Sequence, residues 1–182
     1  MVLRYSKSDR YYVSRGWIYE CVLIALEYMK KLRDAGVTHN QIHREIMFRI
    51  DGANNARKGH YSGAKGFNKS TIDLWSVKAL AAYKKDPKVK LRVEHGSPRT
   101  PFAQRVFNLY LRNKLTEKLF NKMLDDHYKL AVITLDEDQK IRANGDRSVM
   151  HDAPEMRWKA AGIKLVNVGA IAKAPAKGRI AA

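Results

Sequence analysis

Cysteine is almost missing from this chain, since Cys21 is the only one among 182 residues. A single thiol can form no intramolecular disulfide and cannot complete a zinc site built on cysteine. Cys21 lies in an apolar stretch expected to be helical, where a cysteine ordinarily packs as a small buried side chain. Such sparing use of cysteine favours a reducing compartment, and we expect the protein to be cytoplasmic.

Long hydrophobic runs are missing as well. The most apolar stretch is Ile18–Met29, which is twelve residues long and contains Glu20 and Glu27. A membrane-spanning helix needs about 20 apolar residues, so we expect none here. The first residues contain no apolar segment typical of a secretion signal. No expected helix combines a strongly basic face with an aromatic one, so a membrane surface is not the expected partner either.

Acidic residues are scarce relative to basic ones. The chain has 35 Lys and Arg against 18 Asp and Glu, which gives a formal net charge of +17. Such an excess favours a polyanion as partner, and nucleic acid is the commonest polyanion. We therefore expect the protein to bind nucleic acid, with DNA preferred to RNA. Hydrophobic residues still make up 45% of the chain, which is typical of a globular protein.

Helical periodicity dominates the pattern of apolar residues. Spacings of three and four residues and capping signals predict helices near 16–35, 38–50, 71–84, 101–112, 116–127, 135–142 and 154–161. Runs rich in β-forming residues predict strands near 88–95, 128–134 and 163–168. The expected fold is therefore α+β, a helix-dominated single domain over residues 1–168 with a small β-sheet. The Ala-, Gly- and Lys-rich residues 169–182 are expected to be a disordered basic tail.

Residues 51–70 interrupt the helical pattern. They contain four glycines and four Lys or Arg, with no apolar period, which predicts a long basic loop. Glycine lets a backbone approach a phosphate and cations neutralise it, so a nucleic-acid contact and a solvated loop are both open interpretations. The expected phosphate-binding residues are the four cations of this loop and two arginines that follow it in the chain. They are Arg57, Lys58, Lys65, Lys69, Arg92 and Arg99.

A carboxylate and an imidazole stand together at the end of an alternating run. Lys88–His95 alternates polar and apolar side chains, which predicts a half-buried strand that ends in Glu94 and His95. Carboxylate oxygens bind hard divalent cations such as Mg²⁺, and a neutral imidazole can take a proton from a water that attacks a phosphodiester. The strand's parity also places His95 on the apolar face with Val93, so a hydrogen-bonded core histidine is the alternative.

A second acidic group follows the strand expected over 128–134. Asp136 and Glu137 could complete the coordination of a metal held by Glu94. Glu137 is also three residues after Thr134, the spacing of a capping box, and acidic residues favour a helix N-terminus. Metal binding and helix capping are therefore both open for these residues.

Three short motifs are spread over residues 93–165. They are Glu-His-x-x-Pro at Glu94–Pro98, an Ile-Thr strand end with acidic residues at Ile133–Asp138, and Arg-aromatic-x-x-Ala-Gly-Ile at Arg157–Ile163. With them the stretch resembles a group of uncharacterised bacterial and phage proteins, a resemblance that implies no established activity.

The first motif is also similar to the opening of His-Me finger (HNH) nucleases, in which an acidic residue and a histidine end the first strand. This resemblance implies that His95 is the general base and Glu94 a metal ligand. That family continues with a second short strand and then a helix that supplies an Asn or His. Here Pro98 and Pro101 lead directly into a helix, on which Asn108 is the stand-in.

The sequence is therefore interpreted as a metal-dependent nuclease that hydrolyses phosphodiester bonds, with His95 as base and Mg²⁺ held by Glu94, Asp136 and Glu137. One alternative is a non-catalytic DNA- or RNA-binding protein, such as a phage or plasmid regulator. Residues 32–42 resemble the start of a helix-turn-helix, for which residues 67–75 would open the recognition helix. The other alternative is a basic structural protein of a nucleoprotein assembly.

Overall fold

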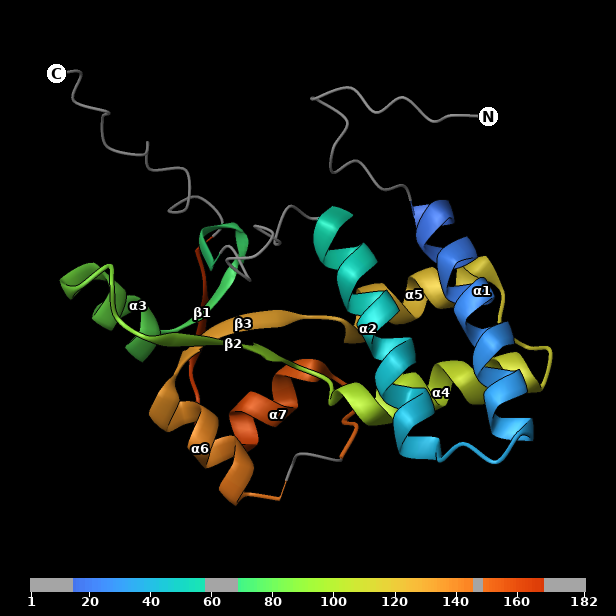
Figure 1. The fold of residues 1–182 in the computed structure, drawn as a ribbon. Coiled ribbons are helices and arrows are strands. Elements are labelled where there is room, and N and C mark those ends of the chain that lie inside the picture. Colours follow the sequence, from blue (N-terminus) through green and yellow to red (C-terminus); the bar gives the residue numbers. More distant parts are fainter. Residues whose placement is uncertain (1–14, 58–68, 146–148, 169–182) are drawn as a thin grey trace, which may run out of the picture.

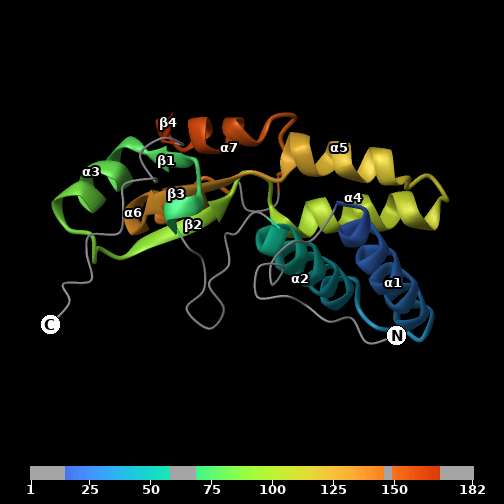
Figure 2. The ribbon, with the colours of Figure 1, turned by 90° about the horizontal axis from the view of Figure 1, so that it is seen from above.

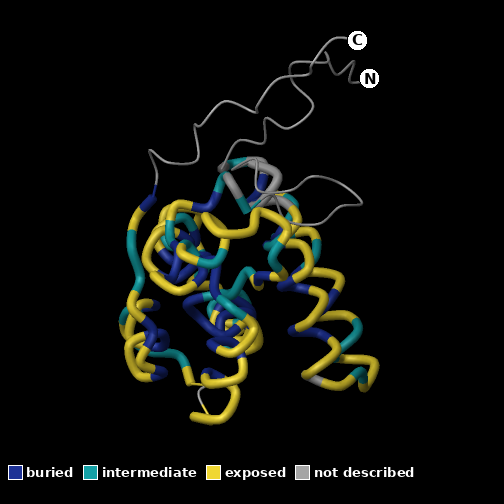
Figure 3. The backbone as a smooth tube through the Cα atoms, turned by 90° about the vertical axis from the view of Figure 1, so that its left-hand side faces the viewer, coloured by how far each residue is buried: buried dark blue, intermediate teal, exposed yellow. Residues whose placement is uncertain are grey.

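The fold has two parts that share its larger hydrophobic core. The computed structural model describes residues 15–57, 69–145 and 149–168. Figures 1 and 2 place helices α1, α2, α4 and α5 on one side, and the sheet with α3, α6 and α7 on the other. Buried residues line the inner sides of the elements, and exposed residues lie outside (Figure 3). The predicted helix-dominated α+β fold is confirmed.

The helical part consists of α1 (Arg15–Asp34), α2 (His39–Arg57), α4 (Arg99–Leu111) and α5 (Glu117–His127). Helices α1 and α2 form a hairpin, and Gly36 between them has φ +88°, a conformation that side chains disfavour. Thr116 caps α5, because its side chain accepts a hydrogen bond from the backbone N–H of Leu119. The apolar stripes of these helices meet in the larger core.

The sheet has four strands in the order β2-β3-β1-β4, one more than the sequence predicted. They are β1 (Leu74–Ser76), β2 (Leu91–His95), β3 (Leu130–Thr134) and β4 (Leu165–Asn167). The β1–β3 pair is parallel, whereas β1–β4 and β2–β3 are antiparallel.

Strand β3 is buried on both faces and joins two cores. Leu130 and Val132 belong to the larger core, whereas Ala131 and Ile133 belong to a smaller one with Trp158. This division follows from the alternation of side chains along a strand. The elements on this side are the 3₁₀ turn η2 (Lys69–Thr71) and the helices α3 (Val77–Lys85), α6 (Leu135–Ala143) and α7 (Pro154–Ala160).

The helix predicted over 71–84 is wrong in its first half. Residues 74–76 form β1, and α3 begins only at Val77, with Ser76 as its N-cap. Trp75 is buried in β1 and its indole N–H donates to the backbone oxygen of Ile72, so the described residues 69–75 do not open a recognition helix. Strand β1 is three residues long, too short for a period to show in the sequence.

The predicted loop over 51–70 is wrong in its first third, because α2 continues to Arg57. Ile50 is fully buried and Asn54, one turn later, is 1% exposed. The inward face of the helix therefore continues past Asp51, and an exposed Gly52 costs it only about 1 kcal/mol. Residues 58–68 and the predicted tail 169–182 lie outside the described part of the chain.

The described ranges contain no helix that combines the length and the apolar character needed to cross a bilayer.

Gly96 is predicted to be essential for packing, whereas Gly52 is not. A Cβ atom on Gly96 would lie 2.4 Å from Cβ of Pro154 and 2.8 Å from Cη2 of Trp158, whereas one on Gly52 would meet nothing within 4 Å. Gly96→Ala should lower the free energy of unfolding by about 1–3 kcal/mol through overpacking. Gly52→Ala, in the exposed interior of α2, should raise it by up to about 1 kcal/mol. Urea unfolding measures both, and equal stabilities for the two variants would contradict this packing.

Candidate functional site

His95 meets a carboxylate that the sequence analysis did not include. His95 ends β2, and its Nε2 lies 3.3 Å from Oδ1 of Asp51, which comes from the last two turns of α2. The side chains of His95 and Asp51 are 13% and 14% exposed. Asp51 was overlooked because it fell in the predicted loop, and the only signal for it was the continuing apolar period of α2.

Asp51 accepts from three side chains at once. Besides His95, the hydroxyl of Tyr128 donates to Oδ1 at 2.6 Å, and Nη2 of Arg99 lies 2.6 Å from Oδ2. Burial raises the pKa of Asp51, but the hydrogen bond and charge of His95, the Tyr128 hydroxyl and the Arg99 guanidinium outweigh it, so the pKa lies below its ordinary value. Asp51 is therefore an anion at neutral pH.

The charge of Asp51 determines the orientation of the imidazole. An ionised carboxylate can only accept hydrogen bonds, so the hydrogen between the two groups belongs to Nε2 of His95. In the neutral ring Nδ1 is then the nitrogen that can take a proton. The ring also packs edge to face against Tyr128, with centroids 5.5 Å apart and planes at 87°. Two contacts thus hold this histidine in one orientation.

Glu94 faces a different partner. Its Oε1 accepts from Nη1 of Arg157 at 2.6 Å, and the same Nη1 donates to the backbone oxygen of His95 at 2.5 Å. The Arg157 side chain is only 5% exposed. Glu94 therefore neutralises a buried cation of α7, and this pair fixes the end of β2 against that helix.

The structure does not bring the predicted metal ligands together. Glu94 is opposite Ala131, whereas Asp136 and Glu137 follow Thr134, which is opposite Leu91. Three residues along a strand correspond to about 10 Å, so the two acidic groups lie near opposite ends of β2. Across the residues that the structure describes, no three His, Cys, Asp or Glu side chains form a group that could hold a metal ion.

Glu137 and Asp136 have other surroundings. The Glu137 carboxylate accepts from the Ser76 hydroxyl at 2.5 Å and from the backbone N–H of Thr134 at 2.9 Å, which completes the predicted capping box. Asp136 is exposed in the first turn of α6. Of the two open interpretations, capping is the one that the geometry supports, and these residues do not fit the Mg²⁺ site implied by the sequence.

The surroundings of His95 also differ from a His-Me finger. Only residues 96–98 separate β2 from α4, and they form no strand. Asn108 is exposed in the third turn of α4. The second strand that follows the catalytic histidine in that family is therefore not formed here.

The six predicted phosphate-binding residues do not form one group. Arg99 is 51% exposed and contacts Asp51, which places it beside His95. Arg92 is 57% exposed and lies 3.7 Å from Asp138 at the other end of β2. Lys69 is in η2 and Arg57 is the last residue of α2. Lys58 and Lys65 lie outside the described residues.

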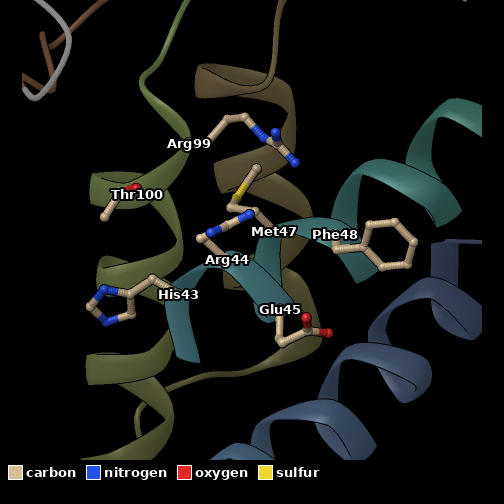
Figure 4. A pocket seen from close by; sticks show the side chains of 7 residues that line it. All are labelled: His43, Arg44, Glu45, Met47, Phe48, Arg99 and Thr100. Carbon is tan, nitrogen blue, oxygen red and sulfur yellow. The ribbon is translucent and has the colours of Figure 1, made fainter. Parts of the chain in front are cut away.

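A pocket of about 340 Å³ lies between α2 and the start of α4, next to Arg99 (Figure 4). We call it the α2–α4 pocket. Its lining comprises His43, Arg44, Glu45, Met47, Phe48, Arg99 and Thr100. Arg99 therefore belongs both to the pocket and to the contacts of Asp51.

Comparison of the chain with protein-family models, with curated proteins and with solved structures gives no match. The function must then be inferred from the chemistry of the site. That chemistry comprises an imidazole oriented by a carboxylate, a half-exposed guanidinium group and an adjoining pocket.

Glu94 is predicted to act on stability rather than on metal binding. Glu94→Ala would leave the buried guanidinium of Arg157 without its carboxylate, and should lower the free energy of unfolding by about 2–4 kcal/mol. Glu155→Ala is the matched control, because its pair with Lys129 is exposed and worth little. Chemical denaturation with and without Mg²⁺ measures the effect. A Glu94→Ala protein as stable as the control, but no longer stabilised by Mg²⁺, would contradict this role.

Asp51 is predicted to stabilise the protein at neutral pH but not in acid. Because folding lowers the pKa of Asp51, its contribution is complete above its unfolded pKa, about 4, and is lost as the pH falls through the lower folded value. Asp51→Asn should therefore cost about 1–3 kcal/mol at pH 7, and progressively less below about pH 4. Denaturation across this pH range measures the difference, with Asp34→Asn as the exposed control. A cost independent of pH would show that the charge is irrelevant.

Proposed function

We propose that the protein binds nucleic acid and cleaves its phosphodiester bonds, with His95 as the general base. The observation that carries this proposal is the Asp51–His95 contact beside the half-exposed Arg99. A carboxylate that orients an imidazole is a recurrent arrangement for activating a nucleophile. A partly exposed guanidinium group beside it offers charge-assisted hydrogen bonds to a phosphate.

The chemistry assigned to this arrangement is hydrolysis. Nδ1 of His95 takes a proton from a water molecule while the water oxygen forms a bond to phosphorus. The bond from phosphorus to one ester oxygen breaks, and that oxygen takes up a proton from the imidazolium or from solvent. Arg99 has five N–H donors, so it can hold the phosphate while it keeps its contact with Asp51. No step in this scheme is assigned to a metal ion.

The charge of the chain supports the choice of substrate. A formal charge of +17 attracts polyanions over long distances, and the attraction weakens as salt is added. Phosphodiester bonds are the reactive groups of the commonest polyanion that such a surface meets.

Binding without cleavage is the second candidate, and one observation favours it. Glu94 is held by a buried guanidinium group, so the implied metal-binding partner of His95 is already engaged. His95 and Asp51 are also mostly buried, which is equally consistent with a structural link between α2 and β2. This candidate predicts salt-sensitive affinity without any change in the nucleic acid.

The deciding variant is His95→Gln, whose side-chain amide can still donate to Asp51 but cannot act as a base. Supercoiled plasmid and a structured RNA are incubated with wild type and variant, with Mg²⁺ and with EDTA. We expect cleavage to fall by about 100-fold or more, with affinity nearly unchanged. His127→Gln is the control, because this histidine ends α5 and its Nε2 lies 3.5 Å from Nη1 of Arg105, away from the pocket.

The alternative outcomes separate the two candidates. Equal cleavage by wild type and His95→Gln would mean that His95 is not the base. No cleavage by the wild type, with affinity that falls steeply as salt rises, would leave binding alone as the function.

A further inference from the structure

The α2–α4 pocket has a floor and two walls of different chemistry. His43 and Met47 are buried and form its floor, while Arg44 and Phe48 of α2 face solvent. The opposite wall is the first turn of α4, which carries Arg99 and Thr100 (Figure 4). Cationic side chains, an aromatic ring and the start of a helix therefore line one pocket of about 340 Å³.

One end of the pocket is suited to a phosphate. Arg99 reaches it from α4 and Arg44 from α2, with Met47 between them (Figure 4). No carboxylate among the described residues pairs with Arg44, whereas Nη2 of Arg99 contacts the carboxylate of Asp51. The N-cap of α4, Pro98, makes no side-chain hydrogen bond, so the first N–H groups of this helix have no side-chain cap. Two guanidinium groups and such a helix start together attract an anion.

The aromatic wall of the pocket is suited to a nucleobase. Phe48 is 63% exposed, although burial of a phenylalanine is favourable. The guanidinium of Arg49 lies over one face of the Phe48 ring, 5.8 Å from its centroid. The other face of the ring is the one on which a base could stack. Bases stack on exposed aromatic side chains, and nearby arginines add to the interaction. The single carboxylate of the lining, Glu45, lies at the end away from Arg99 (Figure 4).

We propose that this pocket binds one unpaired nucleotide of a single-stranded nucleic acid. Its phosphate contacts Arg44, Arg99 and the first turn of α4, and its base stacks on Phe48. A base inside a duplex already has neighbours on both faces, so a single aromatic side chain selects bases that are not stacked in a helix. Because Arg99 also contacts Asp51, the bound phosphate lies on the same guanidinium group as the catalytic pair.

The inference depends on the proposed function only in taking nucleic acid as the ligand, and it does not depend on cleavage. Its test is therefore a binding measurement, made in EDTA, that does not depend on cleavage. The probes are a fluorescently labelled oligothymidylate and a labelled duplex of the same length, titrated with the full chain. Wild type should bind the single strand more tightly than the duplex.

The variants separate stacking from charge. Phe48→Ala should weaken binding of the single strand by about five- to 100-fold, Phe48→Trp should restore it, and neither should change duplex binding more than about twofold. Tyr28→Ala, which removes an exposed aromatic that does not line the pocket, is the matched control and should bind like wild type.

The charge is tested in the same way. Arg44→Ala should weaken binding and lower the slope of log affinity against log salt by about one, whereas Arg112→Ala at the far end of α4 should change neither. Equal affinity of Phe48→Ala and wild type for the single strand, or tighter binding of the duplex, would overturn the inference. Equal cleavage by wild type and His95→Gln, with these binding results as expected, would overturn the proposed function alone.

Discussion

The interaction on which the rest depends is the acceptance of three donors by the carboxylate of Asp51. The donors come from different segments: His95 from the end of β2, Arg99 from α4, and Tyr128 from the short connection between α5 and β3. A buried carboxylate is costly unless it is paired and hydrogen-bonded, so these contacts stabilise one another. They connect the helical part to the sheet, and they orient the imidazole on which the proposed chemistry depends.

Neighbouring residues at the end of β2 have opposite roles for a simple geometric reason. Successive side chains of a strand point to opposite faces, so Glu94 turns to Arg157 of α7 while His95 turns to Asp51 of α2. The Glu-His pair therefore is not one site. Glu94 fixes the strand, and His95 lies where an anion bound at Arg99 would come close to it. Asp136 and Glu137 lie near the other end of β2, so they are not beside Glu94 as the sequence analysis expected.

Local signals predicted much of the fold. The helices that begin after Thr116 and Thr134 and the strand β3 were predicted correctly, because the signals for each lie close together in sequence. Strand β1 was not, since its three residues owe their conformation to pairing with β3 and β4. The site was predicted only in part. His95 and Arg99 were identified by their chemistry, whereas Asp51 is 44 residues from His95 and only tertiary structure joins them.

The central claim is that Asp51 is an anion stabilised by these three donors, and a ¹³C NMR titration of its carboxyl group tests it most directly. Asp51→Asn identifies the resonance, and Tyr128→Phe removes one donor. The account predicts that Asp51 titrates below the ordinary aspartate pKa and that Tyr128→Phe raises this pKa. A pKa at or above the ordinary value, or one that does not respond to Tyr128→Phe, would contradict it.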